Sequence, residues 1–247
     1  GTATYNFYQE DVHDFAWTAS PHFLKLTRTF EWGKEVRADE LVSWSKFLSV
    51  PAEQLALRDV SVTLLLQPDH RNIAERYFRA TFNALKYYGL WYGMYPYDTL
   101  TVVDPARRSN SGGMEYPTLF TGGAYFWPGS HSMTPEGVTV HEFGHQFWYG
   151  LVANNEFEHA WLDEGLTTYS TGKVIEVAYP SQCSYRHFFG MPVPLWEWLE
   201  VRVPSFPFAG VKQIPLGPYF SCVDYPERTA ARHSYLENAE SDELVRN

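Results

Sequence analysis

Apolar and polar residues alternate in two stretches near the start of the chain. From residue 5 to 17, and again from 22 to 32, aromatic and β-branched side chains alternate with polar ones, with Ser20 and Pro21 between the two stretches. Such alternation is typical of β-strands with one buried face, because successive side chains of a strand point to opposite faces. We therefore expect two strands joined by a turn, followed by a connection over residues 33–56 that contains a helical or strand piece.

The next segment combines strand and helix patterns. A run of β-branched residues and leucines at 60–66 predicts a buried strand, and a similar run at 99–103 predicts another. Between them, Asp69 is a candidate N-cap for a helix over residues 70–90. This helix has one apolar face, formed by positions 73, 77, 78, 82, 85 and 88. The order strand, helix, strand indicates a sheet covered by helices.

Two further helices are predicted in the middle of the chain. The first runs over residues 135–149, with Thr134 as N-cap, Pro135 in its first turn and Gly150 at its end. The second runs over residues 161–177 and ends before a proline. Beyond it, prolines alternate with aromatic residues, so we expect short helices and turns there.

The first of these helices carries the pattern H-E-x-x-H. His141 and His145 are one turn apart, so their side chains project from one face of the helix and can bind a single metal ion, with Glu142 beside that face. The second helix begins near Trp161 and brings in Glu164 as a third ligand, which leaves a fourth position for water or substrate. Three protein ligands and one open position are typical of a catalytic zinc site, and the pattern is that of zinc proteases.

A glycine-containing segment precedes the metal motif. Gly112 and Gly113 let the backbone approach a ligand closely, and Pro117 cannot donate a hydrogen bond to a neighbouring strand. We interpret residues 112–117 as an edge strand whose hydrogen-bonding groups could pair with an extended peptide. The alternative is a plain glycine turn with a solvated Glu115.

The composition excludes some kinds of partner and of metal site. The formal net charge of −10 argues against nucleic acid as a partner, and the 45% of hydrophobic residues suffices for a sizeable core. Neither Cys183 nor Cys222 has metal-ligand spacing to another cysteine or to a histidine, so the cysteines offer no second metal site. No apolar run reaches about 18 residues and no signal-peptide pattern is visible, which leaves the compartment unknown.

These patterns predict an α+β fold. We expect residues 1–180 to form one domain, a mixed sheet with an edge strand along a cleft and two metal-binding helices. Residues 181–247, rich in proline and aromatic residues, are expected to begin a helical lobe that the chain contains only in part. The chain opens in strand-like sequence and closes at Asn247 without a stop signal, so we expect it to be a piece of a longer protein.

Together, these features resemble the catalytic domain of the gluzincin zinc aminopeptidases, the family of membrane alanyl aminopeptidase and leukotriene hydrolase. The resemblance covers most of the chain and is most specific at the metal motif. The segments that carry it are His13-Asp14-Phe15-Ala16-Trp17, Leu85-Lys86-Tyr87-Tyr88, Tyr95-Pro96-Tyr97, Gly112-Gly113-Met114-Glu115, the H-E-x-x-H helix and Trp161-Leu162-Asp163-Glu164-Gly165.

The resemblance implies a thermolysin-like catalytic domain that removes the N-terminal residue of peptides. It implies one zinc ion per chain, bound by His141, His145 and Glu164, and a zinc-activated water from which Glu142 takes a proton. It also implies that Glu115, with the Gly-Gly-Met segment before it, holds the free α-amine of the substrate. Further domains of the parent chain and an extracytoplasmic or membrane-associated location are expected on the same basis.

The sequence departs from the family pattern at four places. Tyr116 replaces the usual asparagine after the edge-strand glutamate, which changes the first subsite, and Asp163 replaces the usual asparagine before the zinc glutamate. Thr171 stands where an acidic residue usually orients a zinc histidine, and loss of such a contact weakens metal affinity or activity about 10 to 100-fold. Tyr225 has nearly the spacing of the family's oxyanion-stabilising tyrosine, but in a different sequence context.

Two other functions remain open from the sequence. The same zinc site could belong to an endopeptidase or an epoxide hydrolase in which Glu115 has another role. Alternatively, the departures at Tyr116 and Thr171 would suit a catalytically weak, peptide-binding zinc domain. Glu142 argues against a purely structural site, because such a site needs no base beside its ligands.

Overall fold

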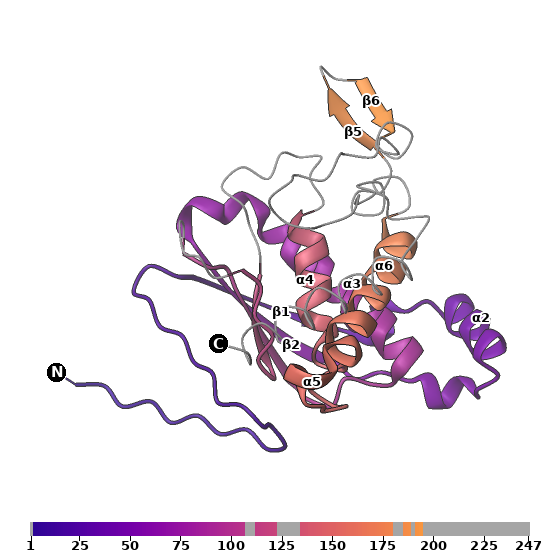
Figure 1. Ribbon diagram of the computed structural model, residues 1–247, viewed down its shortest axis with the longest axis horizontal. Coiled ribbons are helices and arrows are strands. Elements are labelled where there is room, and N and C mark those ends of the chain that lie inside the picture. The colour runs from indigo at the N-terminus through magenta and orange to yellow at the C-terminus, as the bar shows by residue number, and fades with distance from the viewer. Residues whose placement is uncertain (1, 107–111, 123–133, 180–184, 189–190, 195–247) are drawn as a thin grey trace.

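A mixed four-stranded sheet forms the centre of the fold (Figure 1). The computed structural model describes residues 2–106, 112–122, 134–179, 185–188 and 191–194. The strands, in their order in the sheet, are β1 (Leu24–Phe30), β2 (Val60–Leu66), β3 (Thr99–Val103) and β4 (Leu119–Thr121). Strand β1 runs antiparallel to β2, whereas β2, β3 and β4 are parallel to one another. A mixed sheet combined with helices is the α+β class that the sequence predicts.

Helices cover one face of this sheet. Alternate residues of β2 are buried, and the residues between them are half-buried. Helix α3 (Ala74–Tyr92) contacts β1 and β2, and α4 (Thr134–Gly144) contacts β4. Helix α6 (Leu166–Ala178) packs on both α3 and α4. The strands predicted at 60–66 and 99–103 are confirmed, and the apolar face predicted for the long helix lies in the core.

The strand predicted at residues 5–17 does not form. These residues pair with no strand of the described chain, and Figure 1 shows them as an extended arm that runs away from the sheet. Its large side chains, which are 72% to 84% exposed, are Tyr5, Phe7, Tyr8, Phe15 and Trp17. The prediction was wrong because alternation only marks a face that can be buried, whereas a strand also needs a neighbour to pair with. The second predicted strand, over 22–32, is confirmed as β1.

The connection over residues 33–56 is mostly helical, and the long helix begins later than predicted. The connection contains α1 (Trp32–Glu35), α2 (Ala38–Leu48) and the short 3₁₀ segment η1 (Ala52–Leu55). Asp69 lies within another 3₁₀ segment, η2 (Pro68–Ile73), so it does not cap α3. Pro68 occupies the first position of η2, where its missing N–H is not needed, and this starts the helical turn before Asp69 can act as a cap.

The helix that carries the H-E-x-x-H pattern is shorter than predicted. It ends at Gly144, and residues 145–150 form tight turns. Gly150 was expected to end the helix, but the positive φ, of 100°, is found one residue earlier, at Tyr149. The apolar pattern did not show this end because Phe147 remains buried in the turn, so the hydrophobic spacing continues past the helix.

The second predicted helix, over residues 161–177, is confirmed in two joined parts. A π-helical turn, η3 (Trp161–Gly165), leads directly into α6, and the short helix α5 (Glu156–Ala160) precedes it. A π-turn accommodates an extra residue and so rotates the side chains that it carries relative to the following helix. Glu164 projects from this turn.

Little of the region after residue 180 is described. A hairpin of two short strands, β5 (Tyr185–Phe188) and β6 (Met191–Pro194), stands apart from the central sheet (Figure 1). Cys183, Cys222 and Tyr225 lie outside the described residues. Within the described part of the chain, no helix combines the length and the apolar character needed to cross a bilayer.

Candidate active site

Helix α4 is fixed against α3 at both ends. Near its start, Glu136 accepts two hydrogen bonds of 2.6 Å from the guanidinium of Arg76 on α3. Near its end, the ring of Phe143 meets the ring of Tyr88 edge-on, with centroids 5.6 Å apart. Gly144 makes this approach possible, because a Cβ at that position would collide with the Tyr88 hydroxyl. These contacts fix the orientation of α4 against α3, and so the direction in which its His141 and Glu142 side chains project.

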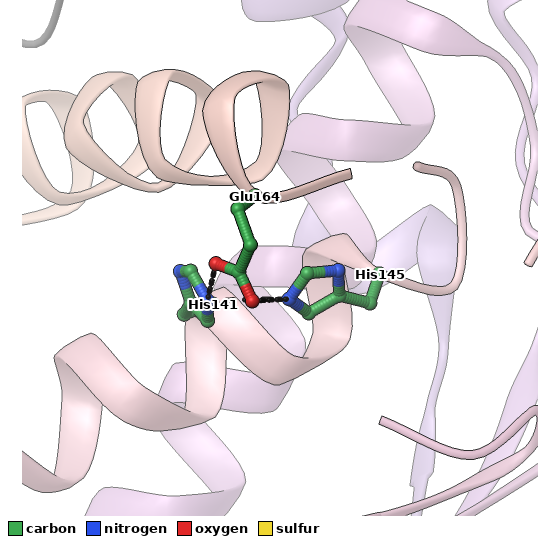
Figure 2. Close-up of side chains that lie close together, drawn as sticks. All are labelled: His141, His145 and Glu164. Carbon is green, nitrogen blue, oxygen red and sulfur yellow. Dashed lines mark hydrogen bonds and ion pairs between the residues drawn. The ribbon is translucent and has the colours of Figure 1, made fainter. Parts of the chain in front are cut away.

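The structure brings together the three metal-ligand candidates selected from the sequence. Figure 2 shows the Glu164 carboxylate between the imidazoles of His141 and His145. Glu164 Oε2 lies 3.2 Å from His141 Nε2, and Glu164 Oε1 lies 3.7 Å from His145 Nε2. The two Nε2 atoms are 3.2 Å apart. Two helical segments that are distant in the sequence therefore aim three ligand atoms at one point.

Asp163 holds the other side of the His145 ring. Both residues are buried, and Asp163 Oδ1 lies 2.5 Å from His145 Nδ1, with the Thr167 hydroxyl 3.3 Å from the same nitrogen. Burial lowers the pKa of His145, but the hydrogen bond that its Nδ1 donates to Asp163 and the charges of Asp163 and Glu164 outweigh this effect and raise the pKa to about 10. This environment favours a positive charge at Nε2, from a proton or from a metal ion. Among the described residues, Thr171 makes no hydrogen bond to either histidine.

Glu142 is buried beside the two histidines. Burial is the main cause that raises its pKa to about 7, and the positive charges of His141 and His145 partly oppose it. The backbone at Gly113 lies directly against the Glu142 carboxylate, where a Cβ on residue 113 would collide with it. Glycine at this position therefore lets the segment before β4 reach the side chain of the candidate base.

Glu115 lies in the same cluster. One oxygen of Glu115, one of Glu142 and a ring nitrogen of His145 all lie within 4.8 Å of one another, and Glu115 forms a second such group with Asp163 and Glu164. Burial raises the pKa of Glu115, and the neighbouring carboxylates add to the effect. A half-buried carboxylate among other carboxylates is a favourable site for a cationic group.

The rest of the predicted substrate-binding segment is only partly a strand. Of residues 112–117, Met114 alone forms a bridge, antiparallel to Thr121, so the edge strand of the sheet is β4. The prediction of an edge strand over the whole segment was therefore wrong. The carbonyl of Gly112 accepts a hydrogen bond of 2.9 Å from the Thr121 hydroxyl. Tyr225 lies outside the described residues, so its predicted role stays a prediction.

Two residues at the site were not assigned a role there from the sequence. Asp163 was noted only as a departure from the family pattern, although a carboxylate directly before a ligand glutamate is a usable signal. Gln146 follows His145 and bonds to the backbone of Tyr116 and Thr118. No periodicity marks such a contact, because it joins segments that are 28 and 30 residues apart.

The fold and the site together define a class of protein. A helix-covered mixed sheet, an H-E-x-x-H helix and a glutamate from the following helix are the parts of a metallopeptidase domain. The model of the peptidase family M1 domain matches residues 76–197, which include every residue of the cluster around His145. This match agrees with the resemblance that the sequence shows to zinc aminopeptidases.

The chain is also similar to individual proteins. Leucine aminopeptidase 2 of Aspergillus niger is 38% identical over 97 residues, which cover 38% of this chain and 14% of that protein. Leucine aminopeptidase 2 of Aspergillus clavatus is 39% identical over 79 residues, or 31% of this chain and 12% of that protein. The chain thus spans about one seventh of the length of such relatives. A solved structure, Legionella pneumophila aminopeptidase A in complex with aspartic acid, is similar with a TM-score of 0.40 and 17% identity, over 49% of this chain and 15% of that one.

Proposed function

We propose that this chain is the catalytic part of a zinc-dependent aminopeptidase, which hydrolyses the N-terminal residue from peptides. The observation that carries the proposal is the convergence of His141, His145 and Glu164 beside the buried Glu142. The match of residues 76–197 to the peptidase family M1 domain, and similarity to proteins named leucine aminopeptidase, support the reaction class.

The donor set fits a zinc ion. Two imidazole nitrogens and one carboxylate oxygen are typical ligands of catalytic zinc. The Nε2 atoms of His141 and His145 approach to 3.2 Å, and a cation between two such nitrogens and a carboxylate relieves their repulsion. Because His145 Nδ1 donates to Asp163, the lone pair of Nε2 is directed toward the ligand position.

Glu142 is the candidate general base. Zinc at such a site supplies a Lewis acid that lowers the pKa of a water ligand and polarises the carbonyl of the bond to be cut. The carboxylate of Glu142 can accept a proton from this water and return it to the amine of the leaving peptide. Burial raises the pKa of Glu142, which favours the transfer of a proton from this water to its carboxylate.

Glu115 is the candidate anchor for the substrate's free amino group. The half-buried carboxylate of Glu115 would be stabilised by an ammonium group, whereas a neutral acetylated terminus would leave it without a counter-charge. This asymmetry would direct the enzyme to the ends of peptides. The Gly112 to Met114 segment before Glu115 would line the same subsite.

We also propose a division of the chain. Residues 1–180 would form a thermolysin-like catalytic domain, and 181–247 the beginning of a helical lobe, with further domains elsewhere in the parent protein. The relatives are about seven times longer than the matched part, which supports additional domains. Tyr225 remains a candidate for oxyanion stabilisation in that lobe. If it does not reach the site in this chain alone, turnover should be about 10²–10³-fold below that of the parent protein.

The decisive experiment uses the full-length protein and short peptide amides, with and without an N-acetyl cap. We expect one zinc per chain and cleavage of the free peptides only. His145→Ala should lose the metal, whereas Glu142→Gln should retain it and lose about 10²–10⁴-fold in turnover. Equal rates on capped and free peptides would instead favour an endopeptidase, and absence of zinc from wild-type protein supplied with the metal would refute the site.

A further inference from the structure

Both hydrogen bonds of the Gln146 side-chain amide go to one turn of the backbone. Gln146 is buried, at 1% exposure, directly after the ligand candidate His145. Its Oε1 accepts a hydrogen bond of 2.8 Å from the N–H of Thr118, and its Nε2 donates one of 3.0 Å to the carbonyl of Tyr116. Both halves of the amide therefore hold the short turn that follows Glu115.

This turn needs such support. Thr118 has φ of 62°, a left-handed conformation that β-branched residues rarely adopt because it is strained. The turn is also tied to the sheet, because the carbonyl of Thr118 accepts a hydrogen bond of 2.8 Å from the N–H of Thr101 in β3. A strained conformation persists only where its surroundings hold it, and here Gln146 provides part of that support.

In the sequence, Glu115 lies between this turn and a backbone contact at Gly113 with α4. On the N-terminal side of Glu115, Met114 accepts a hydrogen bond of 2.9 Å from Thr121, and the backbone at Gly113 presses against the Glu142 carboxylate. On its C-terminal side, the turn is held by Gln146. Glu142 and Gln146, which make these contacts, belong to the same segment as His141 and His145. The position of Glu115 is therefore defined relative to the ligand candidates.

We infer that Gln146 is a positioning residue that sets where Glu115 stands relative to the metal centre, and so where the amino terminus of a substrate comes to rest. This inference rests on the proposed aminopeptidase function. Gln146 would touch neither substrate nor metal, and it would act through the turn at Tyr116 and Thr118. Its replacement should therefore change the recognition of the free amino group before it changes the metal site.

Three variants of the full-length protein test this role. Gln146→Met keeps the approximate volume and removes both hydrogen bonds. Gln146→Glu keeps an acceptor for the Thr118 N–H but cannot donate to the Tyr116 carbonyl, and it provides a second test if the methionine variant folds poorly. Gln67→Met is the matched control, because Gln67 also donates a side-chain hydrogen bond to a backbone carbonyl, that of Asp104, at 3.2 Å.

The measurements are zinc content, thermal stability, and kcat and KM on free and N-acetylated peptide amides. With Gln146→Met, we expect KM for the free peptide to rise about tenfold to 10²-fold, since a displacement of about 1 Å has effects of this size. The preference for free over capped peptide should fall by a similar factor, and zinc should stay at one per chain. Gln146→Glu should change KM and the preference in the same direction, and Gln67→Met should keep the wild-type preference.

Two results would overturn the inference, and they can be told apart. If Gln146→Met or Gln146→Glu lowers thermal stability but keeps the wild-type KM and preference, Gln146 has only a structural role and the proposed function is untouched. If wild-type protein with bound zinc cleaves capped and free peptides equally, the aminopeptidase proposal fails, and the positioning role fails with it.

Discussion

Asp163 provides His145 with the carboxylate partner that the sequence led us to seek at residue 171. The 2.5 Å contact between Asp163 Oδ1 and His145 Nδ1 fixes the ring and increases the negative charge near the ligand position. We predict that Asp163→Asn, which keeps the shape but removes the charge, lowers zinc affinity about 10 to 100-fold. Competition against a chromophoric chelator measures this directly on the purified protein.

The matched control for this substitution is Asp98→Asn. Asp98 is a largely exposed carboxylate that pairs with Arg58 at 2.9 Å. The control should leave zinc affinity unchanged. Equal affinities of wild type and Asp163→Asn would show that the histidine is oriented by other contacts, such as the Thr167 hydroxyl.

Two adjacent glycines differ sharply in what a side chain would meet. At Gly113, a Cβ would collide with the Glu142 carboxylate, whereas at Gly112 nothing lies within 4 Å. The carboxylate can rotate away at little cost in stability, so we predict that Gly113→Ala folds normally but displaces the candidate base and lowers kcat about tenfold to 10²-fold. Gly33→Ala, at a glycine of α1 that likewise has nothing within 4 Å, should behave as wild type. Similar kinetics for both variants would show that Glu142 needs no fixed position.

At the scale of helices and strands, one buried ion pair joins α3 to the start of α4. Arg76 and Glu136 have side chains that are 22% and 6% exposed, whereas those of the exposed pair Arg28 and Glu75 are 48% and 71% exposed. Removing Arg76 leaves a buried carboxylate without this partner, so Arg76→Met should cost about 3–5 kcal/mol. Arg28→Met should cost about 1 kcal/mol or less. Denaturant titrations of the two variants test the difference, and equal losses would contradict it.

Elements whose pattern matches their burial were predictable from the sequence. β2 is buried at every second residue and α3 along one apolar face, and in both cases local periodicity reports the packing. The end of α4 was not predictable, because Phe147 stays in the core while the backbone has already left the helix. The arm at residues 5–17 was not predictable either, because sequence alone does not show whether a partner strand exists.

The same distinction applies to the candidate site. His141, Glu142 and His145 were found because their spacing is local, and Glu164 because it follows at a recognisable distance. Gln146 acts on a turn 28 residues earlier, and no short-range pattern encodes such a contact. The π-turn that directs Glu164 toward the histidines could not be predicted either, because its sequence is compatible with an ordinary α-helix.

At the scale of the whole molecule, the N-terminal arm reaches the α4 side of the fold at two points. The Tyr97 hydroxyl donates a hydrogen bond of 2.6 Å to the carbonyl of Asp11, and the Tyr149 hydroxyl donates one of 2.6 Å to the carboxylate of Asp14. Tyr149 is the residue with the left-handed backbone just after the metal helix. Residues on either side of this short attachment are largely exposed.

An exposed, extended backbone is also the form of a polypeptide that fits into the active site of a protease. The arm offers aromatic side chains, which chymotrypsin recognises, but no lysine or arginine precedes Lys25, which lies in β1 and pairs with Leu65. Limited digestion of this chain should therefore give rapid shortening by chymotrypsin at Phe7, Tyr8 or Trp17, while trypsin leaves the same segment intact. Mass spectrometry of the early products would distinguish the two patterns, and resistance to both enzymes would mean that the arm is covered in solution.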